Sequence, residues 1–461
     1  MIKTCIICNS PARSGEHVFP AAFGGRRINR GIYCEMHNNA FGCHVDTLVN
    51  SLDIFNAIIG VIPDRHKEIR PTVVTSKGAE QYQLSKDVIK IAPPRSLSET
   101  PELVDKRVML KFADQNQKNK WICDQKNAGY SVELESTGQI RRQIITESLH
   151  TQKQLGDESF MRALFYLALT FLTHKYPELA RSSGLASARD IIAKDESVEN
   201  RVLWEPPSTM EQLCANPFTY GHTVAIGSIA NTNKVGALIS FFGAFHFSVD
   251  LGELTGGDYP TRITTHIDPL AKSHPDDIRE IQDIGKTLIV STSDESRRYL
   301  HELRTGAATG PVISIFQFAG REALLKTCEA LMLELFTLKT APPSMHLSRI
   351  MELLDPHDQR IFNLMKEGIE GFAQSATDIP APIHDVLKLF ITANDDAPRG
   401  LSYNSEAALH IAKVKIADKI LAHINDCTLD TETLAKLLGG GEGQAIVLRT
   451  LTDIIANILP P

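Results

Sequence analysis

Apolar residues recur with helical spacing through the last third of the chain. From about residue 313 onward, hydrophobic positions repeat every three or four residues, the period of one face of an α-helix. Asp355-Pro356 fits a helix start, because Asp caps free N–H groups and Pro is tolerated at the first helical position. Gly439-Gly440-Gly441 fits a turn between two terminal helices. The expected helices are Arg321–Thr337, Pro356–Phe372, Ile383–Thr392 and Ser405–Ile424.

Two earlier parts of the chain alternate apolar and polar residues and therefore predict β-strands. Between them, a helix is expected from an N-cap at Asp157 to Lys175, just before Pro177. A shorter apolar stripe near the N-terminus also has helical spacing: Val45, Leu48, Val49 and Leu52. The strand candidates are Pro71–Ser76, Val88–Ile91, Val108–Phe112, Tyr130–Leu134, Thr223–Ile229, Val235–Val249 and Thr287–Thr292.

These patterns predict an α+β protein of several domains, in keeping with a length of 461 residues. We expect a small N-terminal module over residues 1–55, a mixed α/β region over 72–312 and a mainly α-helical region over 313–461. The first fifty residues are punctuated by glycine and rich in Cys, His and Asn. Because such a short segment buries little apolar surface by itself, it is expected to need a metal to hold it together.

The net charge of −7 excludes a protein that binds polyanions over its whole surface. Residues 1–50 nevertheless carry five Lys and Arg against three Asp and Glu, so any contact with DNA is expected there. No apolar run reaches the roughly 18–20 residues that span a bilayer, and the N-terminus lacks the pattern of a secretory signal. We therefore expect a cytoplasmic protein with no membrane partner.

Two pairs of metal-binding residues stand in the N-terminal segment. Cys5-Ile6-Ile7-Cys8 is a C-x-x-C knuckle, and Cys34-Glu35-Met36-His37 is a C-x-x-H pair that follows after 25 intervening residues. Two thiolates on a tight turn and two ligands at a helix start can form a tetrahedron around structural Zn²⁺. The fourth ligand stays open at this stage, because Cys43 or His44 could replace His37.

A second set of residues, which zinc binding does not explain, lies between and just after these pairs. Phosphodiester hydrolysis needs a base for water and a cation to offset charge on the phosphate. His17 is suited to be the base, since imidazole titrates near neutral pH. Glu16 and the amide oxygen of Asn38 are hard ligands that suit Mg²⁺ or Mn²⁺.

The run E-H-V-F-P-x3-G-G-x3-N-x4-C-x2-H-N-N-x2-G, from Glu16 to Gly42, resembles the ββα-metal nucleases of the HNH superfamily, in the branch where zinc brackets the active site. The resemblance implies that His17 is the general base and that Glu16 and Asn38 hold the catalytic metal. It also implies that Asn29 fixes the loop and orients the imidazole. The fold expected is thus an α+β multidomain protein with a zinc-stapled ββα-metal (HNH) module at its N-terminus.

Two positions depart from the family pattern. Asn38 replaces the commoner His at the last motif position, a variation also found in the HNH domains of RNA-guided CRISPR nucleases. His37 stands where the second zinc pair more often ends in Cys. The first departure puts the strength of catalytic metal binding in doubt, and the second loosens the zinc assignment. The resemblance covers about a tenth of the chain.

The sequence therefore predicts an HNH endonuclease that acts on nucleic acid, with DNA favoured over RNA. Loop residues Arg26, Arg27 and Arg30 are candidate phosphate contacts, although a solvated basic loop explains them equally well. Since one HNH site cuts one strand, we expect a homodimer or larger assembly. The C-terminal part is expected to sense a signal, with a small-nucleotide activator and a role in anti-phage defence as hypotheses. The alternative is a non-catalytic zinc-dependent nucleic-acid-binding or interaction protein.

Overall fold

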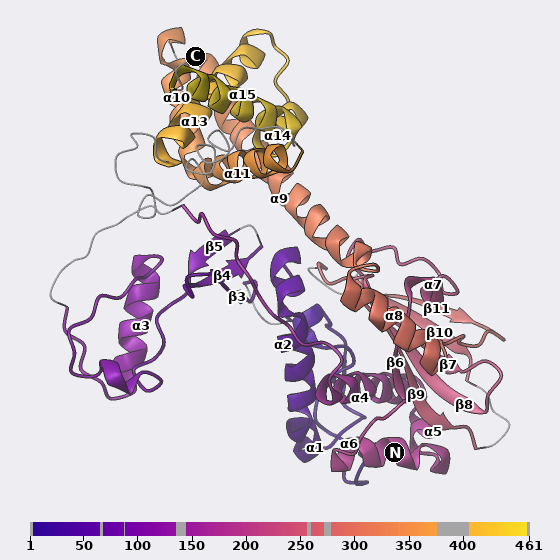
Figure 1. The fold of residues 1–461 in the computed structure, drawn as a ribbon. Coiled ribbons are helices and arrows are strands. Elements are labelled where there is room, and N and C mark those ends of the chain that lie inside the picture. Colours follow the sequence, from indigo (N-terminus) through magenta and orange to yellow (C-terminus); the bar gives the residue numbers. More distant parts are fainter. Residues whose placement is uncertain are drawn as a thin grey trace.

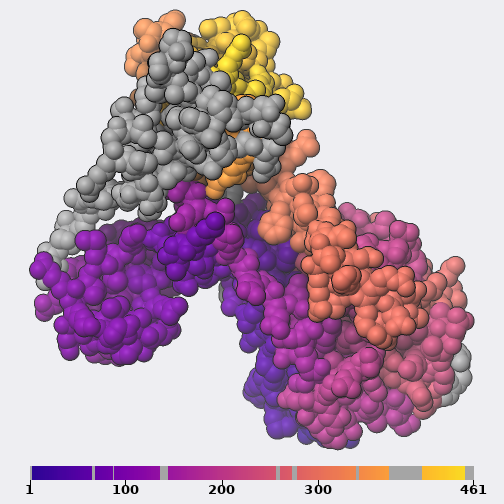
Figure 2. Space-filling view, in the orientation of Figure 1, coloured from indigo at the N-terminus to yellow at the C-terminus, as the bar shows by residue number. Residues whose placement is uncertain are grey.

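The computed structural model describes residues 3–64, 68–86, 88–134, 144–255, 260–271, 278–340, 342–375 and 405–458. Figure 1 shows a mixed α/β body that contains the N-terminus, a C-terminal helical bundle, and the long helix α9 (Gly310–Phe336) between them. Residues 93–134 form a lobe around α3 (Gln115–Asn127), which stands apart from the body on the face drawn in Figure 2. Among the described helices, none combines the length and apolar character needed to cross a membrane.

The N-terminal segment folds as a short hairpin followed by helices. The hairpin pairs Glu16 with Asn29 and His17 with Ile28 in antiparallel register. The stripe of apolar residues predicted a helix correctly, since Leu48 and Leu52 are fully buried. The elements are β1 (Glu16–His17), η1 (Ala21–Phe23), β2 (Ile28–Asn29), α1 (Glu35–Ala40) and α2 (Gly42–Ile59).

A six-stranded antiparallel sheet forms the centre of the body, in the order β11-β10-β7-β8-β9-β6. Helix α4 (Glu158–Lys175) lies across one face of it and begins at the predicted N-cap Asp157, whose carboxylate accepts from the N–H of Phe160. Smaller helices flank it: α5 (Pro177–Arg181), η3 (Ser183–Leu185), α6 (Ala186–Lys194) and α7 (Pro207–Met210). The strands are β6 (Val202–Trp204), β7 (His222–Ser228), β8 (Lys234–Phe241), β9 (Phe245–Glu253), β10 (Arg262–Ile267) and β11 (Ile278–Asp283).

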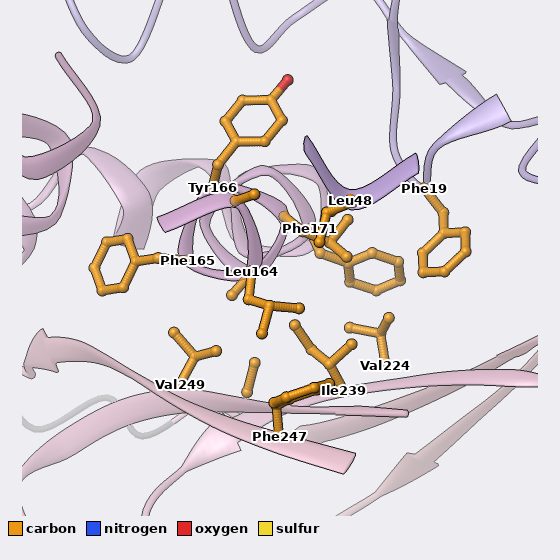
Figure 3. Packing of buried hydrophobic residues seen from close by; sticks show 14 of the residues in the cluster. Phe19, Leu48, Leu164, Phe165, Tyr166, Phe171, Val224, Ile239, Phe247 and Val249 are labelled. Carbon is orange, nitrogen blue, oxygen red and sulfur yellow. The ribbon is translucent and has the colours of Figure 1, made fainter. Parts of the chain in front are cut away.

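The N-terminal segment shares one hydrophobic core with this sheet. In Figure 3, Leu164 and Phe171 of α4 point toward Val224 and Phe247 of the sheet, whereas Tyr166 leaves α4 on the far side. Buried residues from Cys5 to Val61 belong to the same cluster. Burial of apolar surface stabilises the folded state by roughly 25 cal/mol per Å². The packing of the N-terminal segment on the sheet therefore adds to any folding stability that a bound zinc contributes. The expectation that metal alone holds the segment together does not fit this packing.

Strand predictions fail where a segment lacks a partner strand. Residues 108–112 and 130–134 are not strands, and Met109 is 96% exposed. Residues 287–292 form only an isolated parallel bridge, between Leu288 and Ile229, and Thr292 caps α8 (Ser293–Thr305) through a capping box with Glu295. The 235–249 segment is two strands, because Phe242 and Gly243 turn the chain with positive φ.

A three-stranded sheet packs beside α2: β3 (Thr72–Thr75), β4 (Gln81–Ser85) and β5 (Val88–Ile91).

The C-terminal region is helical, as predicted, and has a core of its own. Helix α9 joins the two cores, since Ile315 belongs to the first and Cys328 to the second. Lys413 is almost buried and bonds to Asp355 and Asp358 at 2.6 and 2.8 Å. The expected helix over 383–392 lies outside the described residues. The helices are α10 (His346–Leu354), α11 (Asp358–Ser375), α13 (Ser405–Asn425), α14 (Thr431–Gly439) and α15 (Gly441–Ile458), with short turns η4 (Thr337–Thr340), η5 (Pro343–Met345) and η6 (Asp355–His357).

Candidate metal centre and hairpin site

The first metal-binding pair sits on a tight turn. The N–H of Cys5 donates to the carbonyl of Ser10 at 2.7 Å, and the N–H of Asn9 donates to the carbonyl of Cys5 at 3.1 Å. Asn9 has a φ of 60°, in the left-handed region that Asn tolerates better than most residues. The turn therefore points both thiols of the C-x-x-C pair toward one place.

The second pair sits at the start of α1. Cys34 is the N-cap of this helix, with extended backbone angles, and His37 lies one turn further on. The Sγ atoms of Cys8 and Cys34 are 3.7 Å apart, and His37 Nδ1 lies 3.2 Å from Cys34 Sγ and 3.6 Å from Cys5 Sγ. All four ligand atoms lie within 4.8 Å of one another.

These distances fit a tetrahedral zinc site. With Zn–S bonds of about 2.3 Å and Zn–N bonds of about 2.0 Å, the edges of the tetrahedron would be about 3.5–3.8 Å. The cluster also settles the fourth donor in the described structure, because it contains His37 and neither Cys43 nor His44. The Cys43 thiol donates to the carbonyl of Ala40, and the ring of His44 packs on Tyr166. A Cys3His group that can hold zinc is therefore present.

Helix α4 presents a polar stripe to the hairpin. Residues 166, 170 and 174 are four apart and lie on one face of the helix. Each bonds to a residue of the N-terminal segment, at 2.8, 2.9 and 3.0 Å respectively. The three pairs are Glu16–Tyr166, Tyr33–Thr170 and Asn29–His174.

Glu16 lies in this buried layer and is only 8% exposed. The Tyr166 hydroxyl donates to Glu16 Oε1 at 2.8 Å, and Tyr166 stacks on the ring of Tyr33. Burial raises the pKa of Glu16 from its ordinary 4.5 to about 7, although the hydrogen bond from Tyr166 works in the opposite direction. In the absence of a cation, the carboxyl is therefore about half protonated at neutral pH.

This raised pKa predicts a pH-dependent stability. Between pH 4.5 and about 7, folded Glu16 retains a proton that the unfolded chain releases, so the free energy of unfolding falls as pH rises through this window. The full effect is about 3 kcal/mol, an order-of-magnitude figure. We expect Glu16→Gln, which keeps an acceptor for Tyr166, to be more stable than wild type at pH 7.5 and no more stable at pH 4.5. Urea unfolding of both proteins without added Mg²⁺ or Mn²⁺ measures this difference, and equal curves at both pH values contradict it.

His17 lies on the other face of the hairpin, because side chains alternate along a strand. Its Nε2 is 3.1 Å from Asp64 Oδ2, and the imidazole is 23% exposed. Arg26 reaches the other oxygen of Asp64 at 3.4 Å. Glu16 and His17 thus have separate sets of partners, in the α4 layer and at Asp64 respectively.

The other site residues predicted from the sequence are Asn29, Asn38 and the loop arginines, and they differ in their hydrogen-bond partners. Asn29 Oδ1 accepts from the N–H of Gly31 at 2.8 Å, which fixes the loop, but its amide donates to His174 rather than to His17. Asn38 lies on α1, and its Oδ1 is buried with no partner among the described residues.

The three loop arginines differ in how far other groups of the protein already bind them. Arg26 bonds to Asp64 and the carbonyl of Ala271, Arg27 lies 3.6 Å from Glu280, and Arg30 is exposed.

The glycine pair of the sequence pattern has a packing reason. A Cβ at Gly24, whose φ is +84°, would lie 2.7 Å from Pro269 Cα, and one at Gly25 would lie 2.1 Å from the carbonyl oxygen of Phe19. The backbone of this loop therefore packs directly against the turn after β10, where Arg26 also binds. This contact ties the hairpin to the sheet.

Three partner residues were not found from the sequence: Asp64, Tyr166 and His174. Asp64 follows the linker signal Ile62-Pro63, where no regular pattern predicts contacts. The spacing of Tyr166, Thr170 and His174 was a usable signal, since polar residues four apart on an apolar helix imply a buried polar contact. Comparison with known proteins found no family model that matches the chain and no similar curated protein or solved structure.

Proposed function

We propose that this protein is a metal-dependent nuclease of the HNH type that hydrolyses phosphodiester bonds, with DNA as the favoured substrate. The observation that carries the proposal is the arrangement at His17. Its imidazole is partly exposed at the end of a hairpin and held at 3.1 Å by a carboxylate, and it is followed in the chain by a helix whose N-cap and first turn supply two ligands of a Cys3His cluster. Each part matches a role in the ββα-metal pattern.

The contact with Asp64 suits His17 to act as a general base. When the Asp64 carboxylate accepts from Nε2–H, the ring is held in the tautomer whose lone pair lies on Nδ1. A free imidazole lone pair can take the proton of an attacking water, which is worth roughly 10²–10⁴-fold in rate. Asp64 would thus be a positioning residue, in a role that the resemblance gives to Asn29.

Glu16 and Asn38 are the residues that would hold a catalytic Mg²⁺ or Mn²⁺. Both offer hard oxygen atoms, and the buried Oδ1 of Asn38 lacks a partner in the described structure, which supports a ligand there. A nearby cation would also favour the ionised form of Glu16 over the half-protonated one. The bound ion would offset negative charge on the scissile phosphate.

A second candidate function is a zinc-dependent nucleic-acid-binding or interaction module without hydrolysis. Its supporting observation is the burial of Glu16, whose carboxylate is 8% exposed and bonded to Tyr166 rather than turned toward His17. A carboxylate in that position also fits a purely structural contact between hairpin and helix.

The two functions are separated by incubating the full chain with supercoiled plasmid, linear duplex, single-stranded DNA and RNA. Each substrate is tested with Mg²⁺, Mn²⁺, Ca²⁺ or no added divalent ion. Nicking that requires Mg²⁺ or Mn²⁺ supports the nuclease, and the most rapidly cut substrate identifies its class. Binding of the same substrates without any cleavage supports the second candidate.

We also propose that the protein works as a homodimer or larger assembly, since one site of this type cuts one strand. The C-terminal bundle is the part we assign to assembly or to sensing a small nucleotide, and a role in anti-phage defence would follow from such sensing. Light scattering on the purified chain is expected to give at least twice the chain mass of 50.9 kDa. A monomer at micromolar concentration, with and without nucleic acid, would contradict this part.

A further inference from the structure

Basic side chains from three separate segments, together with one acid from a fourth, gather beside strand β2. We call this set the hairpin cluster. It comprises cations near the N-terminus, on β2 and its loop, and at the end of α4, together with one acid on β11. Its members are Lys3, Arg27, Arg30, His174, Lys175 and Glu280.

A single carboxylate organises the inner cations. Lys175 bonds to Glu280 Oε2, and Arg27 NH1 lies 3.6 Å from the same oxygen while its side chain stays 40% exposed. Lys3 lies over the loop after β2, because a Cβ built on Gly31 would be 3.2 Å from Lys3 Nζ. Glu280 therefore balances one of two cations, and Lys3 adds a further charge.

His174 adds a neutral donor to the same place. Because the amide of Asn29 can only donate, Nδ1 of His174 must accept, and the ring proton is then on Nε2. Burial lowers the pKa of His174 to about 4, with further lowering from Lys175, Arg27 and Lys3. The imidazole is thus an uncharged N–H donor at neutral pH, and these cations lie near enough to act on it.

The charge of the cluster contrasts with that of the whole chain. The cluster contains four cations and one acid, whereas the whole protein carries a net charge of −7. Arg26, by comparison, is occupied by Asp64 and the carbonyl of Ala271. Arg27 and Asn29 flank Ile28, which is the cross-strand partner of His17. The cluster therefore lies on the strand paired with that of His17, but on the α4 face of the hairpin, whereas His17 and Ile28 point to the opposite face.

We infer that the hairpin cluster binds the phosphodiester backbone of the nucleic acid that His17 is proposed to cut, on the α4 side of the hairpin. The inference rests on the proposed function in placing cluster and catalysis on one substrate. Phosphate oxygens accept hydrogen bonds and favour several cations close together, which matches guanidinium, ammonium and imidazole N–H groups around one strand. Lys3, Arg27 and Arg30 replace Arg26 as the main phosphate contacts.

The test measures binding rather than cleavage. Fluorescence anisotropy of labelled duplex and single-stranded DNA is recorded with the full chain in Ca²⁺, over a series of salt concentrations. Lys3→Gln and Arg27→Gln are each expected to weaken binding roughly three- to tenfold and to lower the slope of log K against log[salt] by about 1. Glu280→Gln is expected to tighten binding, because it removes the one acid of the cluster. If these residues had only a structural role, removing the cations would not weaken DNA binding while removing the acid tightened it.

A matched ion pair far from the cluster is the control. Lys436 and Glu432 form an exposed pair on α14, and Lys436→Gln and Glu432→Gln should leave affinity and salt slope unchanged. Equal binding by wild type and the cluster variants overturns the inference, as does no binding by wild type at low salt. If wild type binds with the expected variant effects but never cuts, the inference stands and the nuclease proposal fails. If the wild-type protein cuts nucleic acid while the cluster variants bind it as tightly as wild type, the nuclease proposal stands and the inference about the cluster fails.

Discussion

Cys5→Ser is expected to remove the bound zinc and to destabilise the N-terminal half of the body. Cys5 is fully buried and supplies one of four ligand atoms that converge within 4.8 Å. Structural zinc contributes about 10–16 kcal/mol of apparent binding free energy in isolated finger peptides. The effect here should be smaller, on the order of 3–5 kcal/mol, since the segment also packs on α4 and the sheet. Metal analysis should fall from about one zinc per chain to nearly none, with a lower midpoint of urea unfolding.

Cys43→Ser is the matched control for this experiment. Cys43 is an exposed cysteine on the neighbouring helix α2, and its thiol contacts only the carbonyl of Ala40 among the described residues. Its replacement should leave zinc content and unfolding midpoint unchanged. Full zinc content in the Cys5 variant, or equal losses in both variants, would show that the four residues do not form the metal site.

His17→Ala is expected to reduce metal-dependent cleavage by about 10²–10⁴-fold, the usual contribution of a general base. Zinc content and unfolding midpoint should remain close to those of wild type, because the side chain is partly exposed and hydrogen-bonds only to Asp64 among the described residues. Asp64→Asn should give a loss of similar size, since its amide can donate to Nε2 and so favour the tautomer that has no lone pair on Nδ1. Initial rates on the preferred substrate measure both effects.

His301→Ala provides the control for histidine removal, since His301 is exposed on α8 and far along the chain from the hairpin. It should cut at the wild-type rate. Retained cleavage in His17→Ala, with intact zinc content, would remove His17 from the role of base. A loss of cleavage that follows a loss of zinc would instead point to damage of the fold.

The zinc ligands could be predicted from the sequence because short-range spacing determines their geometry. A C-x-x-C turn and a C-x-x-H pair at a helix start each fix two donors through local backbone shape alone. Only the choice between His37 and its neighbours needed the structure, which turns His44 onto Tyr166. The same locality explains why α4 was predicted correctly, since its Asp cap and its mostly apolar central turns lie within one segment.

Strands were predicted less well, because a strand is defined by its partner. Val108 and Leu134 lie in segments with alternating patterns but have no neighbouring strand, and both are largely exposed. Strand β10 was not predicted, because it contains the polar residues Arg262, Thr264 and His266. In the structure it lies between β7 and β11, and all of its residues are buried. Pairing across the sheet supplied the hydrogen bonds that its composition did not indicate.

The sequence by itself determined three of the four metal-binding residues, Cys5, Cys8 and Cys34, and the helical character of the C-terminal region, and it pointed to Glu16, His17 and Asn29 as candidate site residues. These features depend on residues close together in the chain. Only the tertiary structure decided what the hairpin residues contact. Helix α4, 150 residues away, buries Glu16 against Tyr166, while Asp64 holds His17 on the opposite face. Such contacts depend on how distant apolar surfaces pack together, and no local pattern contains that information.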